Sequence, residues 1–111
     1  MKPIKITDRK PKHDPNRIGD LAEHYAITWL WDNGYHVFKN CGCTGIVDLI
    51  AIDKNGNTRL IDVKTFHKDN RWGGTWTNIS APRSIEQKQK GVQVLGFNPK
   101  TRKLRFVEHK T

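Results

Sequence analysis

Apolar residues recur every three to four positions between residues 16 and 33. This spacing is typical of one face of an α-helix. The face consists of Ile18, Leu21, Ala22, Tyr25, Ala26 and Trp29. Glu23 lies at the border of the face, near Leu30, and Gly34 follows as a stop signal. The pattern therefore predicts an amphipathic helix over about Asn16–Asn33.

Shorter apolar runs with the composition of β-strands follow this helix. The runs are Tyr35–Lys39, Ile46–Asp53, Thr58–Thr65, Val92–Phe97 and Lys103–Glu108. The polar segment Lys54–Asn57 predicts an antiparallel hairpin between the second and third runs, and Asn98–Thr101 predicts a turn between the last two. Between the third and fourth runs, the segment from Ser84 to about Lys90 predicts a short helix, with Ser80 or Ser84 as its cap.

This order of elements predicts an α/β or α+β domain, with a mixed central sheet of about five strands flanked by helices. The chain has 111 residues, a length typical of one domain. We assign residues 16–111 to that domain and the basic, proline-containing residues 1–15 to a flexible arm. The cations of the arm suit a phosphate backbone, and a solvated tail is the alternative.

A long polar stretch, Phe66–Pro82, separates the third strand from the second helix and predicts a loop. It carries Arg71, Trp72 and Trp76, and glycines lie among them. Two tryptophans and an arginine can stack on unpaired bases or wedge between them. The alternative is that the tryptophans fold back and cover the core.

Lysine and arginine number 20 against 11 aspartates and glutamates, which gives a net charge of +9. An excess of this size favours a polyanionic partner, most often nucleic acid, over a basic protein without one. The apolar runs fall short of the ~18 residues of a membrane span, and the polar start lacks a signal-peptide pattern. Cys41 and Cys43 are too close for a structural disulfide and too few for zinc. We expect a cytoplasmic protein without membrane association, whose thiols stay reduced.

Two aspartates and a lysine are the strongest chemical signal in the chain. Asp48 lies in the second predicted strand, and Asp62 and Lys64 lie in the third. Because side chains alternate along a strand, Asp62 and Lys64 point the same way, and the hairpin brings Asp48 alongside. Two carboxylates beside an ammonium predict a divalent-metal site that can cut a phosphodiester. For Asp62 and Lys64 alone, the alternative is a salt-bridged strand surface.

The order of these elements resembles the PD-(D/E)XK nuclease superfamily over roughly residues 16–97. The proline expected before the first aspartate is Val47 here. The resemblance implies a restriction-endonuclease-like core and a metal-dependent endonuclease. The matching elements are Gly19–Glu23 on the first helix, Gly45–Asp48 on the second strand, Asp62–Lys64 on the third strand and Gln87 on the following helix.

The resemblance also implies a role for each matching residue. Lys64 is expected to orient or activate the attacking water, and Gln87 to position the phosphate or the nucleophile. Glu23 is expected to bind the metal through water. The remaining metal ligands are Asp48, Asp62 and the backbone carbonyl of Val63, and the metal is expected to be Mg²⁺, for which Mn²⁺ substitutes.

Within the superfamily, the chain is similar to the small archaeal-type Holliday junction resolvases, which phages also carry. The similarity rests on the small size, the basic arm, the Gly-x-x-x-Glu start of the helix and the small residues before Asp48. It implies a homodimer that cuts four-way junctions or other branched DNA in recombination or repair, in the host cytoplasm if the protein is viral. The candidate DNA contacts are Lys5, Arg9, Lys10, Lys12, Arg17, Arg71, Trp72, Trp76 and Arg83.

Three other functions fit parts of the pattern. A sequence-specific homing or restriction-type endonuclease, or a nicking enzyme, shares the core, although 111 residues leave little room for added specificity segments. A non-catalytic nucleic-acid-binding module has no need of Glu23, Asp48, Asp62 and Lys64. A small RNA-binding protein accounts for the charge and the tryptophans but not for the acids.

Overall fold

The computed structural model describes residues 14–42, 45–69, 75–78 and 83–108. Its first element, α1 (Pro15–Asp32), begins after Asp14, whose carboxylate accepts hydrogen bonds from the N–H groups of Asn16 and Arg17. The helix ends before Gly34, which has a φ of +87°. These bounds confirm the helix predicted from the apolar stripe. No helix in the described part of the chain has the length and apolarity of a membrane span.

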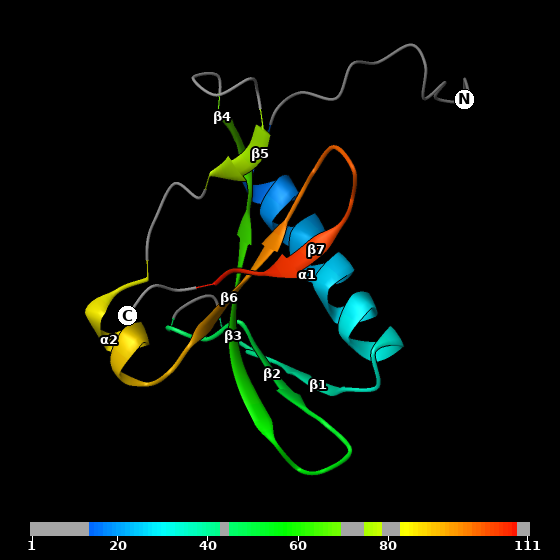
Figure 1. Ribbon diagram of the computed structural model, residues 1–111, viewed down its shortest axis with the longest axis vertical. Helices are drawn as coiled ribbons and strands as arrows, with labels where there is room; N and C mark the ends of the chain where they lie inside the picture. The colour runs from blue at the N-terminus through cyan, green and yellow to red at the C-terminus, as the bar shows by residue number, and fades with distance from the viewer. Residues whose placement is uncertain (1–13, 43–44, 70–74, 79–82, 109–111) are drawn as a thin grey trace.

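Five strands form the main sheet, in the order β1-β2-β3-β6-β7 (Figure 1). Neighbouring strands are antiparallel except β3 and β6, which run parallel because the chain returns through the short helix α2 (Ile85–Gln89). This is the mixed, five-stranded α+β sheet that the sequence predicts. The strands are β1 (His36–Lys39), β2 (Leu49–Ile52), β3 (Thr58–Thr65), β6 (Gln93–Phe97) and β7 (Leu104–Phe106).

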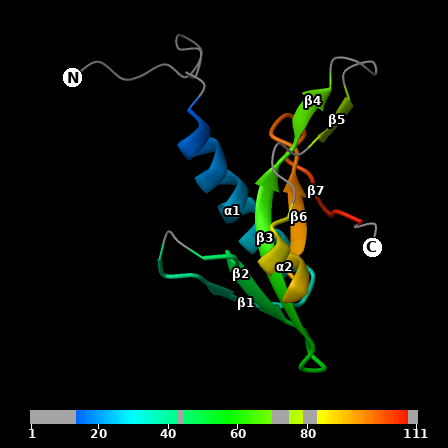
Figure 2. The same cartoon turned by 90° about the vertical axis from the view of Figure 1, so that its left-hand side faces the viewer.

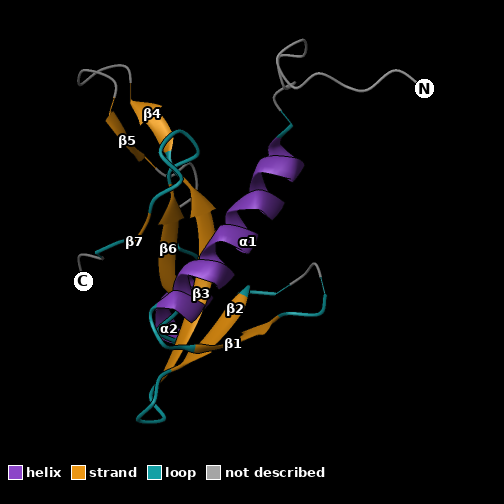
Figure 3. Cartoon of the chain, turned by 90° about the vertical axis from the view of Figure 1, so that its right-hand side faces the viewer, coloured by secondary structure: helices purple, strands orange, loops and turns teal. Residues whose placement is uncertain are grey.

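The two helices lie on opposite sides of the sheet, with α2 nearer the viewer in Figure 2 and α1 nearer in Figure 3. The core between α1 and the sheet consists of Ala26, Leu30, Leu49, Ala51, Ile61 and Leu95, all fully buried. Leu30, which the predicted apolar face did not include, is therefore part of it. Tyr25 is 38% exposed, and its ring centroid lies 5.1 Å from that of Phe97.

The stretch Phe66–Pro82 was predicted to be a loop, and this prediction is wrong. It contains a two-stranded antiparallel ribbon, β4 (His67–Asp69) and β5 (Thr75–Asn78), which projects from the end of β3 (Figure 1). Short polar strands lack the apolar alternation that marks a half-buried strand, so the pattern missed them. Arg71, Trp72 and the side chain of Trp76 lie outside the described residues, and their stacking on bases stays a prediction.

Phe66 anchors the ribbon to the main sheet. Its side chain is buried, and its N–H donates to the carbonyl of Phe97 at 2.8 Å. The ring lies against the backbone of Gly96, where an added Cβ atom would overlap it. The guanidinium of Arg105 lies 4.6 Å from the ring centroid. Only glycine at position 96 leaves room for this arrangement.

Candidate active site

Asp48 and Asp62 meet where β2 lies against β3. Strand β2 begins at Leu49 rather than at Ile46, where the sequence predicted its start, so Asp48 lies just before the strand. The N–H of Asp48 donates to the carbonyl of Ile61 at 2.8 Å, and its Oδ2 accepts from the N–H of Val63 at 2.7 Å. Because these two bonds reach the residues on either side of Asp62, they hold the two aspartates next to each other.

Asp62 and Lys64 share one face of the sheet, as predicted from strand alternation. Ile61 and Val63 pack toward α1, so Asp62 and Lys64 point to the opposite face. The Nζ of Lys64 lies 3.4 Å from the Oδ2 of Asp62. Asp62 is only 7% exposed, and this contact lacks the angles of a hydrogen bond, which leaves Oδ2 without a hydrogen-bond partner among the described residues. A buried carboxylate oxygen in this state is suited to a further cation.

Burial, together with neighbouring carboxylates, raises the pKa of Asp48 from 3.8 to about 6. Burial is the largest cause, and a hydrogen bond with the Asp62 side chain is the next. The negative charges of Asp62 and Glu23 raise the pKa further, while the N–H of Val63 lowers it. Because burial and the neighbouring carboxylates disfavour the ionised form of Asp48, a divalent cation bound beside it would stabilise that form.

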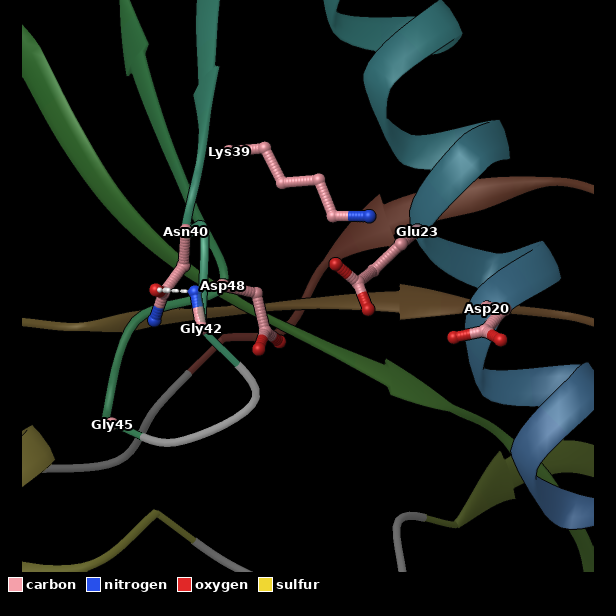
Figure 4. Close-up of a pocket in the computed structure, with 7 residues that line it drawn as sticks. All are labelled: Asp20, Glu23, Lys39, Asn40, Gly42, Gly45 and Asp48. Atoms are coloured by element: carbon pink, nitrogen blue, oxygen red, sulfur yellow. Dashed lines mark hydrogen bonds between the residues drawn. The ribbon is translucent and has the colours of Figure 1, made fainter.

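A cavity of about 230 Å³ lies between α1 and the start of β2. Figure 4 shows that Glu23 points across it toward Asp48 and that Lys39 extends into it from the end of β1. The helix glutamate is therefore brought to the strand aspartate, as the sequence predicts. Asp62 and Lys64 do not line this cavity, so the site extends from it across the sheet. The lining residues are Asp20, Glu23, Lys39, Asn40, Gly42, Gly45 and Asp48.

Two charged residues of the cavity, Asp20 and Lys39, are not among the predicted site residues. Asp20 precedes Glu23 by three positions, so helical spacing alone places both on one side of α1 and would have found it. Lys39 ends β1, and only the pairing of β1 with β2 brings it near Asp48. With these additions, the cavity has three carboxylates and one ammonium in its lining.

The loop before Asp48 is shaped by glycine and by one asparagine. Gly45 has a φ of +116°, a conformation that favours glycine. Asn40 bridges the loop, because its Oδ1 accepts from the N–H of Gly42 at 2.9 Å (Figure 4) and its Nδ2 donates to the carbonyl of Val47 at 3.0 Å. The backbone conformation at position 45 therefore explains the glycine there.

Gln87 is buried on α2 and holds the same segment from the other side of the sheet. Its Nε2 donates to the carbonyl of Ile46 at 2.9 Å, and its Oε1 accepts from the N–H of Ser84 at 2.9 Å. Ser84 is the helix cap, and its side chain accepts from the N–H of Gln87. With both ends of its amide bonded to backbone, Gln87 positions the chain before Asp48. Its contact with a phosphate stays a prediction.

The donor set fits Mg²⁺. Within the described ranges, no three Asp, Glu, His or Cys side chains gather closely enough to hold a metal ion by themselves. Mg²⁺ takes one or two carboxylates and keeps several waters, whereas structural zinc takes four protein ligands. Asp48 and Asp62 supply the two carboxylates. The Val63 carbonyl and a water-mediated contact to Glu23 stay predictions.

The predicted DNA contacts fall mostly outside the described residues, where Lys5, Arg9, Lys10 and Lys12 lie with Arg71 and Trp72. Arg17 is exposed near the start of α1. The guanidinium of Arg83 donates to the carbonyl of Val92 at 3.1 Å, so part of this side chain is committed to the fold.

Comparison with known proteins identifies the architecture. No protein-family model matches the chain, and no curated protein matches it. Among solved structures, the chain is similar to a bacterial homing endonuclease, I-Ssp6803I, with a TM-score of 0.67 and 20% sequence identity over 86% of this chain and 69% of that chain. At this identity the likeness shows the fold alone. The protein therefore has the mixed sheet and flanking helices of a nuclease-like core.

Proposed function

We propose that this protein is a metal-dependent endonuclease that hydrolyses phosphodiester bonds in DNA. The observation that carries the proposal is the buried Oδ2 of Asp62, which lies beside Asp48, has Lys64 at 3.4 Å and lacks a hydrogen-bond partner in the described chain. The likeness of the fold to a homing endonuclease supports it. The net charge of +9 supports a polyanionic substrate.

In this mechanism Asp48 and Asp62 would hold Mg²⁺ or Mn²⁺, together with the carbonyl of Val63. Such an ion, when bound there, would supply polarisation of the phosphate and a lowered pKa of water. Lys64 orients the attacking water and stabilises the negative charge that develops on the phosphate. Glu23 holds water on the α1 side of the site.

Branched DNA, such as a four-way junction, is the substrate that the resemblance to resolvases favours. A homodimer with two-fold symmetry would place two sites on symmetry-related strands of the junction. Phosphate contacts would then select the shape of the DNA rather than its sequence. The second candidate is a sequence-specific endonuclease of homing type, which the class of the structural neighbour favours.

The test is cleavage of a four-way junction, a linear duplex and a single strand of matched sequence, each with Mg²⁺ and with a chelator. Paired, symmetric nicks in the junction alone support a resolvase. A cut at one position of the linear duplex supports the homing-type enzyme. Retained binding without cleavage of any DNA would contradict the endonuclease and leave a binding module.

An Asp62→Asn variant ties cleavage to this site. We expect a rate loss of about 10³-fold or more, because the change removes a charge that the transition state needs. DNA binding should be retained or become tighter, because a negative charge that faces phosphate is lost. Asp32→Asn is the matched control, since Asp32 is exposed at the end of α1. Equal rate losses in both variants would place the chemistry elsewhere.

A further inference from the structure

The turn from β6 to β7 and the start of β7 carry a dense group of cations. No acidic residue lies between Phe97 and Phe106. All four cations in this segment are exposed, and the ion pairs of the described chain lie elsewhere. We call this group the basic hairpin; it consists of Lys100, Arg102, Lys103 and Arg105.

Strand pairing places Arg105 of the basic hairpin on the face of the sheet that carries Asp62 and Lys64 of the candidate active site. Lys64 pairs with Gly96, and Gly96 pairs with Arg105. Paired residues point to one face, so Arg105 shares the face of Lys64 at two strand spacings, or about 10 Å. Asp62 pairs with Val94, four residues before the turn begins at Asn98, which places the turn about 13 Å beyond Asp62.

A second cavity, of about 280 Å³, lies beside the hairpin and combines three kinds of surface. Phe66 and Leu104 line it with apolar atoms, and Lys103 and Arg105 line it with cations. Asn98 also lines it; its Oδ1 accepts from the N–H groups of the turn at 2.9 and 3.2 Å. This leaves the Nδ2 of Asn98 as a donor. Cations and an amide donor suit phosphate oxygens, and the apolar surface suits a deoxyribose ring.

The candidate active site itself repels a polyanion before metal binds, because its cavity holds three carboxylates and one ammonium. Attraction must therefore come from nearby cations that no acid neutralises. We propose that the basic hairpin binds the phosphate backbone of the DNA substrate within about four nucleotides of the cleaved bond, at a rise of about 3.4 Å each. This inference rests on the proposed endonuclease function and names the surface that DNA follows from the site.

The hairpin between β2 and β3 provides a control. It lies at the opposite end of the sheet from the basic hairpin (Figure 1) and carries Lys54 next to Asp53. Lys88, on α2, is also exposed. The double variants Lys100→Ala/Lys103→Ala and Lys54→Ala/Lys88→Ala each remove two exposed cations, so they change the net charge equally. All four side chains are exposed, which leaves the core of both variants intact.

The first measurement is DNA affinity against salt, by fluorescence anisotropy in the Asp62→Asn background. Two lost phosphate contacts should lower the slope of log affinity against log salt by about 1.8. When the salt concentration rises from about 50 to about 200 mM, the DNA affinity of the protein with the unsubstituted hairpin should then fall about tenfold more than that of Lys100→Ala/Lys103→Ala. The control variant should keep its slope. Equal slope changes in both variants would overturn the inference, because net charge alone would explain them.

The second measurement locates the contact with DNA in which single phosphates are replaced by neutral methylphosphonates. A replacement within about four nucleotides of the cleaved bond should weaken binding to the unsubstituted hairpin but not to Lys100→Ala/Lys103→Ala. Equal weakening in both would overturn the inference. So would an unchanged slope with an altered sedimentation coefficient, because the hairpin would then contact a second copy of the chain. Cleavage is assayed separately. If DNA binds through the hairpin but is not cleaved, the proposed endonuclease function is refuted and the proposed DNA contact of the hairpin stands.

Discussion

The candidate active site and the basic hairpin use charge in opposite ways, although strand pairing places Arg105 of the hairpin on the same face of the sheet as Asp62 and Lys64. Asp62 is 7% exposed, and burial raises the pKa of its neighbour Asp48 to about 6. The hairpin cations are exposed and lack ion pairs in the described chain. Buried charges act strongly over short distances but need a defined partner, whereas exposed charges attract a polyanion weakly and are screened by salt. In the proposed function, the residues that carry out the chemistry and those that attract DNA therefore lie at different places along the sheet.

Among the substitutions that test this comparison, replacement of Lys64 should have the largest effect, and the effect should be on the cleavage rate. Lys64→Ala should reduce the single-turnover rate at saturating DNA by about 10²–10³-fold, because a preorganised positive charge at the phosphate is lost. The slope of log affinity against log salt should change by no more than the amount expected for the loss of one phosphate contact. Lys54→Ala should keep the full rate. A Lys64→Ala variant that loses affinity but keeps its rate would place this lysine with the hairpin cations.

Gly96→Ala tests the physical link between the two regions. The added Cβ would overlap the ring of Phe66, which in turn lies under Arg105. We expect a loss of about 1–3 kcal/mol in the free energy of unfolding, measured with urea. Gly19→Ala is the control, because nothing lies within 4 Å of its added Cβ atom. That change in a helix should increase stability by about 0.5–1 kcal/mol. Equal effects would show that Phe66 moves away without cost.

The smallest effect concerns pH and belongs to the acidic side of the comparison. Because the folded-state pKa of Asp48 is raised from 3.8 to about 6, folding favours its protonated form. The metal-free protein should therefore lose stability as the pH rises from about 4 through about 6, by an amount of the order of 1 kcal/mol because Asp48 is only partly buried. Asp48→Asn keeps an acceptor for the N–H of Val63 and should lack this loss.

The measurement is the free energy of unfolding from urea titrations between about pH 4 and pH 8 in a chelator. The difference between the two proteins isolates Asp48 from the other titrating groups. Parallel curves for the two proteins would contradict the raised pKa.

Much of the fold could be predicted because local patterns agree with the tertiary structure. Helix α1 has a stripe, a cap at Asp14 and a stop at Gly34, and each of these acts within a few residues. The ribbon of β4 and β5 was missed because its strands are short and polar. Leu30 was left out of the predicted face, although it is fully buried, because the width of the buried face depends on the surface that the helix covers.

The candidate site divides in the same way. Asp48, Asp62 and Lys64 could be identified from a hairpin and strand alternation, which are local rules. The contact of Gln87 with the carbonyl of Ile46 and the approach of Lys39 to the cavity depend on elements far apart in sequence. The spacing of apolar residues within a single helix or strand gives no information about these two contacts.

The sequence by itself determined the helix, the five main strands, the acidic cluster and the basic charge, because each depends on near neighbours or on composition. Only the tertiary structure decided which oxygen of Asp62 lacks a hydrogen bond and how far the pKa of Asp48 rises. It also decided that Arg105 of the basic hairpin shares a face with Lys64. These properties depend on burial and on strand pairing across the parallel pair β3 and β6, and both arise only when distant segments pack together.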